Sequence, residues 1–463
     1  MRASVTTLSP FDADRRYVFH PFSNAQRHEQ DGAAALIVGG KGSRLRDTDG
    51  REYLDAMAGL WCVNVGYGRV EIADALRKQA VELPYFHGFS SMATTPPAEL
   101  AEQIVTRFGG GMSKVFYGNS GSDANDTQIK IVRAYNNRRG LPQKKKVISR
   151  DRGYHGVTIA SASLTGLPAM HAEFDLPIEG ISHVSAPYRL WNAEAGEDDA
   201  AFVARLAAEL DAKIVAEGPE TVAAFIAEPV QGAGGVIVPP DGYFAAIQQV
   251  LRKHDVLLIA DEVISGFGRL GSWFGSHALG IEPDLVTIAK GVTSAYVPLS
   301  GVVVSDRVWR VLADGPEGVF QHGYTYSAHP LGAAAALANL RLVEDEGLVA
   351  RAGEQGEKLR SLLREAFADH PLVGEVRGMG LMAAVEFVAE RDPAKRFDPS
   401  LQVAARVVRG ALERGVITRA LPAADTISFS PPFVVTDDEL AAMVDGARAA
   451  FEQVADELTR VRA

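Results

Sequence analysis

Cysteine is almost absent from this chain of 463 residues, in which Cys62 is the single example. One thiol excludes a disulfide within the chain and a zinc site built from paired cysteines, and it favours a reducing compartment. Cys62 itself is expected to serve packing rather than chemistry. The pattern of residues offers no other ligand spacing, so no metal site is predicted.

Long apolar runs are absent as well. No stretch reaches the roughly 18 consecutive apolar residues that a membrane span requires. The first residues, MRASVTTLSPFDADRRYVFHPF, lack the apolar core of a secretory signal. We therefore expect a soluble, cytoplasmic protein that makes no contact with membranes.

Positive charge is not in excess. Lysine and arginine together number 47 against 58 aspartates and glutamates, which gives a formal net charge of -11. This balance argues against binding of a phosphate backbone, so no nucleic-acid partner is expected. The length and a hydrophobic content of 47% are enough for a large core and two domains, or one large domain with a smaller one attached.

The centre of the chain alternates short apolar runs with helical segments. Continuous apolar runs between helices are typical of buried parallel strands, and hence of an α/β fold. The runs end near Gly118, Ser149, Ala227, Ala260 and Ala289. After about Pro330 a long helical segment and strand patterns indicate a smaller α+β domain. We expect residues 61–334 to form the large domain, and residues 1–60 and 335–463 to form the smaller one.

The stretch GFGRLG, Gly266–Gly271, matches the glycine pattern of a dinucleotide-binding loop. Such a loop needs a tight turn directly after a strand and then a helix. Here the first glycine comes several residues after the apolar run, and no clear amphipathic helix follows Gly271. A Rossmann-type NAD-binding oxidoreductase is therefore kept only as the alternative from a different class.

Three polar residues stand directly after the expected strands: Glu228, Asp261 and Lys290. Ligands of open α/β sheets bind beyond the carboxyl ends of the strands. One excursion of loop, helix and strand separates Asp261 from Lys290, so both are expected at the same edge of the sheet. Pyridoxal phosphate forms a Schiff base with a lysine amine, and a carboxylate keeps its ring nitrogen protonated. The pair therefore suggests a pyridoxal-phosphate site.

A phosphate cradle is offered by NSGSDAND, Asn119–Asp126, which follows an expected strand and opens a helix. Backbone N–H groups and the helix dipole favour a dianion at such a position. Gly121 would allow close approach, and the hydroxyls of Ser120 and Ser122 could donate hydrogen bonds. The same letters also suit a plain N-cap turn.

The cofactor ring needs partners on its two faces. Tyr154 and His155, in RGYHG, follow an expected strand at the same edge of the sheet. Val263, in ADEVI, could pack on the opposite face of the ring.

Together, NSGSDAND, GYHG, EPVQGAGGVIVPP, ADEVISGFGRLG, the lysine of TIAKG and HGYTYSAHP resemble the class III aminotransferases, which are pyridoxal-phosphate enzymes of fold type I. The match runs in order from about Asp47 to Pro432. WCVNVGYG and the early HPF most resemble the ω-amine:pyruvate branch. The resemblance implies a large domain with a mostly parallel, seven-stranded sheet flanked by helices, a smaller α+β domain, and a homodimer with shared active sites.

The resemblance also implies a role for each matched position. Lys290 would hold the cofactor and act as the catalytic base, and Asp261 would pair with the ring nitrogen. The other expected cofactor contacts are Ser120, Gly121, Ser122, Tyr154, His155, Glu228 and Val263, with Thr325 reaching in from a partner subunit. The expected substrate contacts are Phe22, Trp61, Tyr154 and Arg419, with Phe89 and Phe320 from the partner. Arg419 would bind the carboxylate of the keto acid and swing out for apolar groups.

The implied activity is transfer of an amino group from a primary amine or ω-amino acid to pyruvate, in ping-pong order. An aminomutase or racemase on the same fold would share Lys290 and Asp261, but would need no second keto acid. A binding protein without catalysis would share only the fold. The intact lysine, aspartate and phosphate loop argue against that last alternative.

Overall fold

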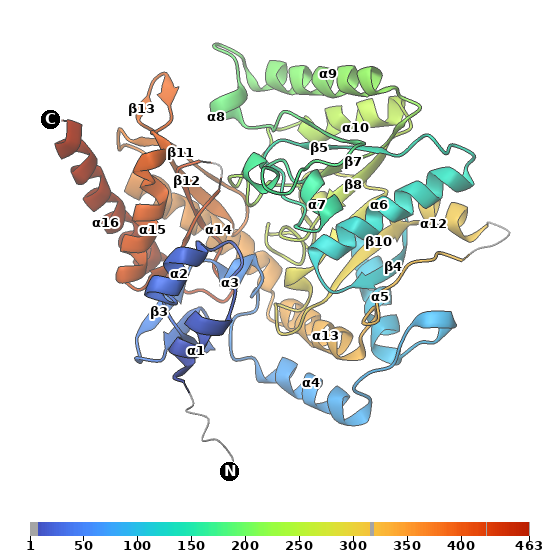
Figure 1. Ribbon diagram of the computed structural model, residues 1–463, viewed down its shortest axis with the longest axis horizontal. Helices are drawn as coiled ribbons and strands as arrows, with labels where there is room; N and C mark the ends of the chain where they lie inside the picture. Colours follow the sequence, from blue (N-terminus) through green and yellow to red (C-terminus); the bar gives the residue numbers. More distant parts are fainter. Residues whose placement is uncertain (1–7, 315–318, 423, 463) are drawn as a thin grey trace.

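The computed structural model of the chain describes residues 8–314, 319–422 and 424–462. Figure 1 shows the large sheet and its helices, coloured from cyan to yellow, on one side of the molecule. The two ends of the chain, blue and orange to red, lie together on the other side. None of the described helices is long and apolar enough to cross a membrane.

Within the described residues, seven strands form the large sheet in the order β4-β10-β9-β8-β7-β5-β6. Strand β10 is antiparallel to both of its neighbours, whereas the pairings among β5 to β9 are parallel. The strands are β4 (Met112–Gly118), β5 (Lys146–Arg150), β6 (Ile181–Val184), β7 (Val222–Ala227), β8 (Leu257–Asp261), β9 (Leu285–Ile288) and β10 (Ser300–Ser305). The expected mostly parallel, seven-stranded α/β sheet is confirmed.

Helices cover both faces of this sheet, which explains why a central strand such as β7 is apolar at every position. In β7, Phe225 packs with α9 and α10, while the next residue, Ile226, packs with α6 on the opposite face. The covering helices are α5 (Thr95–Phe108), α6 (Gly121–Arg138), α9 (Asp199–Glu217), α10 (Tyr243–Lys253), α12 (Asp306–Ala313) and α13 (Pro330–Asp345). Successive side chains of a strand point to opposite faces, so a strand buried on both faces loses its polar alternation.

The C-terminal part is built on a second sheet, in the order β11-β12-β17-β16. Its strands are β11 (Val373–Gly378), β12 (Ala383–Phe387), β16 (Arg419–Ala420) and β17 (Thr426–Phe429), and the hairpin β13 (Glu390–Arg391) and β14 (Ala394–Lys395) stands apart. The helices are α14 (Leu348–Phe367), α15 (Val403–Glu413) and α16 (Asp437–Arg462). This arrangement of helices and antiparallel strands agrees with the expected α+β character.

The N-terminal residues share a third sheet with the C-terminal part. Strands β1 (Ile37–Lys41), β2 (Arg44–Asp47) and β3 (Glu52–Asp55) are joined by β15 (Val416–Ile417), which pairs with β3 in parallel. Leu54 and Val416 belong to one hydrophobic core with α14, α15 and α16. The division of the chain at residues 60 and 334 stays a prediction.

Mostly short helices make up the remaining elements. They are α1 (Pro10–Tyr17), α2 (Ala25–Asp31), α3 (Ala58–Trp61), α4 (Val70–Glu82), α7 (Ile159–Leu164), α8 (Arg189–Asn192) and α11 (Gly275–Ala278), with 3-10 turns at Phe89–Ser91, Pro168–Met170, Lys290–Val292 and Pro399–Leu401. Helices α1 and α2 lie side by side at the N-terminal end of the ribbon (Figure 1).

The loop Gly266–Gly271 does not have the geometry of a dinucleotide-binding loop. Its backbone turns through Gly268 and Gly271, whose φ angles are +105° and +77°. No helix follows directly, since α11 begins only at Gly275 and has four residues. A Cβ on Gly268 would come within 2.8 Å of the Phe433 ring, so the loop needs glycine for packing against the C-terminal part.

The role of this loop follows from the hydrogen bonds of Arg269. Its guanidinium is buried and donates hydrogen bonds to the carbonyl oxygens of Leu381 (3.0 Å) and Pro431 (2.7 Å). It also donates to Oδ1 of Asn64 at 2.8 Å. Burial lowers the pKa of Arg269 to about 9. The loop therefore fastens the large sheet to both the N-terminal and the C-terminal segments.

Helix α14 makes an equally close contact at Gly356, where a Cβ would overlap the carbonyl group of Gly380. Gly356→Ala is expected to lower the free energy of unfolding by about 1–3 kcal/mol, because a close-packed contact has no room for another methyl group. Gly353→Ala, one turn earlier in α14, is the matched control. Its Cβ would meet only the Cα of Gly271, at an ordinary distance of 3.6 Å.

Thermal unfolding midpoints of the two variants test this packing. The midpoint of Gly356→Ala should fall, while that of Gly353→Ala should stay the same or rise, since alanine favours a helix over glycine. Equal midpoints would contradict the close approach of α14 to the turn at Gly380.

Candidate active site

A cavity of about 180 Å³ lies beyond the carboxyl ends of the parallel strands. It is lined by Phe22, Leu60, Trp61, Gly121, Ser122, Tyr154, His155, Gly156, Glu228, Ala233, Asp261, Val263, Ile264, Lys290 and Arg419. Of the residues that the sequence predicts as a site, all except Ser120, Thr325, Phe89 and Phe320 are in this set. Strand ends, helix α6, the turn at Trp61 and strand β16 each supply part of the wall.

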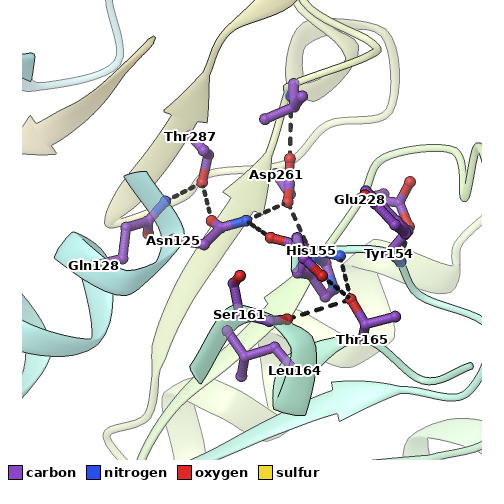
Figure 2. A network of polar contacts seen from close by, with 12 residues as sticks. Asn125, Gln128, Tyr154, His155, Ser161, Leu164, Thr165, Glu228, Asp261 and Thr287 are labelled. Atoms are coloured by element: carbon purple, nitrogen blue, oxygen red, sulfur yellow. Dashed lines mark hydrogen bonds and ion pairs between the residues drawn. The ribbon is translucent and has the colours of Figure 1, made fainter. Parts of the chain in front are cut away.

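Asp261 ends β8, a strand that is buried at every position. Its Oδ2 accepts hydrogen bonds from Nδ2 of Asn125 and from Nδ1 of His155, both at 2.8 Å (Figure 2). Its Oδ1 accepts from the backbone N–H of Val263 at 3.1 Å. Because a carboxylate oxygen accepts, the proton of the imidazole must lie on Nδ1 of His155. The carboxylate is thus fixed by three donors from three segments of the chain.

Asn125 is a site residue that sequence reasoning missed. It lies on α6, and its Nδ2 also donates to the carbonyl oxygen of His155 at 2.6 Å. Its Oδ1 accepts from the hydroxyl of Thr287 at 2.6 Å, and the amide of Gln128 donates to that hydroxyl in turn (Figure 2). Asn125 stands four residues after Gly121, so the helical period was the signal that could have placed it near the cavity.

Glu228 follows β7 and is buried beside Asp261. Its Oε1 accepts from the backbone N–H of Tyr154, and its Oε2 accepts from the backbone N–H of Gly232, each at 2.9 Å. Burial raises the pKa of the Glu228 carboxyl group, and the two N–H groups act in the opposite sense. Burial also raises the pKa of the Tyr154 hydroxyl. Glu228 therefore holds the backbone that presents Tyr154 to the cavity.

The N-terminus of α6 opens on the cavity through Gly121 and Ser122. Gly121 lies against Val263: a Cβ there would be 3.0 Å from Cγ2 of that residue. Ser122 Oγ accepts from the backbone N–H of Val157 at 3.1 Å. Backbone N–H groups at a helix start, together with the helix dipole, favour an anion at this position.

Ser120 lies outside the cavity lining and serves as the N-cap of α6. Its Oγ accepts from the backbone N–H of Asp123 at 3.1 Å, and the Asp123 carboxylate accepts from the backbone N–H of Ser120. Asp123 also accepts from the hydroxyl of Ser300 at 2.9 Å. The interpretation of this stretch as an N-cap turn therefore applies to Ser120, while Gly121 and Ser122 face the cavity.

Lys290 begins the turn after β9 with a φ of +44°, which is uncommon for a residue other than glycine. Its Nζ lies 5.8 Å from the ring centre of Trp61. Burial lowers the pKa of its amine. The chain thus directs a lysine with weakened basicity into the same cavity as Asp261, although the two come from different strands.

Trp61 reaches the cavity from a turn with unusual backbone angles. The φ values of Ala58, Gly59 and Trp61 are +47°, +68° and +57°. The carboxylate of Asp55 supports the turn by accepting from the backbone N–H groups of Met57 (2.9 Å) and Gly59 (2.6 Å). The turn also brings Leu60 to the cavity, a contact that the sequence analysis did not foresee.

Arg419, on β16, completes the wall. Its Cζ lies 5.1 Å from the ring centre of Trp61, so both Arg419 and Lys290 contact the same indole. Burial lowers the pKa of the Arg419 guanidinium. No carboxylate among the described residues forms an ion pair with Arg419. Phe22, although 73% exposed, borders the same cavity.

Thr325, Phe89 and Phe320 lie away from the cavity of their own chain. The carbonyl oxygen of Thr325 accepts from the hydroxyl of Tyr85 at 2.5 Å. The ring of Phe89 lies beside Gly323, where a Cβ would be 3.4 Å from it. Phe320 packs edge-on to other rings near α6. Their predicted entry from a partner subunit stays a prediction.

Comparison with known proteins identifies the family. The model of the family Aminotransferase class-III matches residues 25–451. The chain is 54% identical over 454 residues to the diaminobutyrate–2-oxoglutarate transaminase of Halomonas elongata, and this match covers 97% of each chain. It is 45% identical to the putrescine–pyruvate aminotransferase of Pseudomonas aeruginosa over 94% of each chain. The crystal structure of the ω-transaminase of Pseudomonas jessenii in complex with PMP matches with a TM-score of 0.94 at 44% identity, over 97% of this chain and 99% of that one.

The residues of the cavity suit pyridoxal 5′-phosphate, the cofactor on which this family depends. A helix start with Gly121 offers backbone donors for a phosphate, and Gly121 itself leaves room beside Val263. Asp261 offers a fixed carboxylate for a protonated ring nitrogen, and Lys290 offers the amine. The chain belongs to the class III aminotransferases and is a pyridoxal-phosphate-dependent aminotransferase of fold type I.

Proposed function

We propose that this aminotransferase moves an amino group from a primary amine or ω-amino acid to pyruvate, in ping-pong order. One observation carries the proposal: Arg419 is the single guanidinium that lines the described cavity, and it stands against an apolar wall of Trp61 and Leu60. One guanidinium suits an acceptor with one carboxylate. The apolar wall suits a donor that has no carboxylate near its amine.

Lys290 would hold the cofactor and move the proton. When bound, pyridoxal phosphate supplies an electron sink for the substrate carbon that loses a proton. An exposed lysine has a pKa of about 10.4 and is almost wholly charged at neutral pH. Burial lowers the pKa of Lys290, so more of its amine is neutral and able to accept a proton. The same amine would return the proton to complete the transfer.

Asp261 would keep the ring nitrogen protonated, and the hydrogen bonds that its carboxylate accepts make this possible. Asn125 and His155 donate to the oxygen Oδ2, and Val263 donates to Oδ1. A carboxylate held in this way cannot rotate away from a ring placed against it. Gly121 and Ser122 would bind the phosphate at the start of α6, where the dipole favours an anion.

Arg419 would serve both substrates in turn. A planar guanidinium binds a carboxylate through two parallel hydrogen bonds, which suits the keto acid. When the substrate is an apolar amine, the guanidinium can instead stay against the Trp61 ring. The same cavity can therefore accept both partners of a ping-pong reaction.

A second acceptor, 2-oxoglutarate, has support of its own. The similar transaminase of Halomonas elongata is named for that acceptor, whereas the one of Pseudomonas aeruginosa is named for pyruvate. 2-Oxoglutarate has a second carboxylate and would need a second cation. Because Arg419 is the one guanidinium along the described lining, the cavity favours pyruvate. A mutase or racemase would need neither acceptor, and the named relatives are aminotransferases.

We also propose a homodimer in which Thr325, Phe89 and Phe320 enter the partner's cavity. Thr325 and Phe89 lie on neighbouring segments: the hydroxyl of Tyr85 donates to the carbonyl oxygen of Thr325, and the Phe89 ring lies beside Gly323. Thr325 is exposed, and the exposed fraction of Phe89 is 48%. Exposed residues that surround no cavity of their own are available to a second copy of the chain.

The absorbance of the bound cofactor tests the reaction directly. An apolar primary amine or an ω-amino acid should bleach the visible band, and pyruvate should restore it at least tenfold more efficiently than 2-oxoglutarate. Lys290→Ala should show no bleaching. Recovery with 2-oxoglutarate alone would overturn the choice of acceptor, while recovery with neither keto acid would favour a mutase or racemase.

Arg419→Ala tests the carboxylate site. Loss of a charged, bidentate hydrogen bond is expected to raise KM for pyruvate about 10- to 100-fold, since such bonds contribute about 1.5–3 kcal/mol. The half-reaction with an apolar amine should change little. Arg414→Ala, at the exposed end of α15, is the control and should leave both half-reactions intact. An equal loss in both half-reactions of Arg419→Ala would argue against this role.

Asn125→Ala tests the support of Asp261. Asp261 would lose one of its three donors, so the dissociation constant of pyridoxal phosphate is expected to rise about tenfold. Asn136→Ala is the matched control, because Asn136 is buried in the same helix. Among the described residues, its side-chain amide bonds only to Val132 within α6 and to Arg139 at the helix end. Equilibrium dialysis gives both constants. An unchanged constant for Asn125→Ala would mean that His155 and Val263 suffice.

A further inference from the structure

A second cluster of ligand-bearing side chains lies outside the catalytic cavity, on the first two helices. Asp14 is on α1, His28 is on α2, and His20 is in the connection between them. One ligand atom from each residue lies within 4.8 Å of the other two. In the part of the chain that the structure describes, no other group of three His, Cys, Asp or Glu side chains meets this condition.

The two imidazoles face one carboxylate. Nε2 of His20 is 3.0 Å from Oδ1 and 3.1 Å from Oδ2 of Asp14. Nε2 of His28 is 3.5 Å from Oδ2 of the same residue. Ligands of a tetrahedral zinc ion, at about 2.0–2.2 Å from the metal, stand about 3.3 Å from one another. The two separations between histidine and aspartate therefore match a ligand shell, and the two imidazole nitrogens lie within 4.8 Å of each other.

Hydrogen bonding within the protein accounts for His20, which bonds to the carboxylate of Asp14, but it does not account for His28. Nε2 of His28 is buried and has no hydrogen-bond partner among the described residues. The two rings nevertheless lie with their centres only 4.3 Å apart, at an angle of 48°. Buried polar atoms are normally satisfied, and an unsatisfied one calls for an explanation. A cation between His20, His28 and Asp14 would replace the His20–Asp14 hydrogen bonds and would give Nε2 of His28 a partner.

The cluster is sheltered but accessible. The side chains of His28, Asp14 and His20 are 14%, 17% and 33% exposed. His20 and His28 also line a surface hollow of about 680 Å³, which gives an ion a way in. Arg15 and Arg16 border the same hollow together with Asp12 and Glu29, so its charges are balanced, and Asp12 pairs with Arg15 at 3.2 Å.

We propose that Asp14, His20 and His28 bind one divalent transition-metal ion of the zinc class. Two imidazole nitrogens and one carboxylate oxygen suit zinc, cobalt or nickel, whereas magnesium and calcium prefer oxygen ligands alone. Three protein ligands leave a fourth position on the side of the hollow. The site holds an ion without oxidation or reduction, and it does not depend on which amine the enzyme uses.

The ion would fasten the segment that presents Phe22 to the catalytic cavity. Phe22 lies two residues after His20, has a φ of +53° and borders that cavity. Ligands on α1, on α2 and in the connection would tie all three pieces together. An ion that binds only the folded state also stabilises it by linkage. Zinc should therefore order the wall of the cavity that Phe22 forms.

Calorimetric titration of the chelator-treated holoenzyme with zinc chloride tests the site. The wild type should take up one zinc ion per chain with a single strong transition. His28→Asn should weaken that transition at least tenfold, because asparagine keeps polarity but loses the imidazole ligand. His171→Asn is the matched control: the His171 ring lies 5.9 Å from that of His183, without a carboxylate bridge among the described residues. It should bind zinc like the wild type.

Two outcomes of the titration would overturn the proposal: no stoichiometric zinc in the wild type, or equal affinity in the wild type and His28→Asn. Far-UV circular dichroism with a chelator present shows whether each variant is folded before titration. A wild-type crystal soaked in zinc provides a test that needs no variant. An anomalous peak between Asp14, His20 and His28 supports the site, and peaks found only elsewhere reject it.

Discussion

The buried carboxylate of Asp261 constrains the rest of the site. A buried charge costs free energy unless hydrogen bonds replace the water that it has lost. Asp261 obtains these bonds from α6 through Asn125, from the loop after β5 through His155, and from its own turn through Val263. These segments must keep their relative positions for the carboxylate to stay satisfied. Their positions in turn bring the start of α6 and the ring of Tyr154 to the same cavity.

The opposite wall of the cavity comes from the two ends of the chain. Trp61 follows the N-terminal strands, and Arg419 belongs to the C-terminal sheet, yet the two side chains are in contact. Arg269 fastens these parts to the large sheet through buried hydrogen bonds. The site is thus closed by segments from two ends of the chain that share one hydrophobic core. The glycine-rich loop serves this junction through close packing and the bonds of Arg269, and not through the geometry of a nucleotide-binding loop.

Side chains at strand ends could be placed from the sequence because the geometry of parallel strands is repetitive. Asp261 and Lys290 each follow an apolar run, and such runs end at one edge of a sheet. Side chains placed by a bend could not be located in this way. Ser120 and Gly121 are neighbours, but only Gly121 faces the cavity, because Ser120 turns back to cap α6. Leu60 reaches the cavity only through the positive φ angles of its neighbours.

The sequence by itself determined the α/β class, the family and the placement of a lysine and a carboxylate at one cavity, because these depend on periodicity and on motifs in a fixed order. Only the tertiary structure decided which groups support them. Asn125 meets Thr287 across 162 positions of the chain, and no local pattern records that contact. Asp14, His20 and His28 show no ligand spacing in the sequence. They become a cluster only because α1 and α2 pack against each other. This packing brings one side chain from each helix and one from the connection between them to the same point.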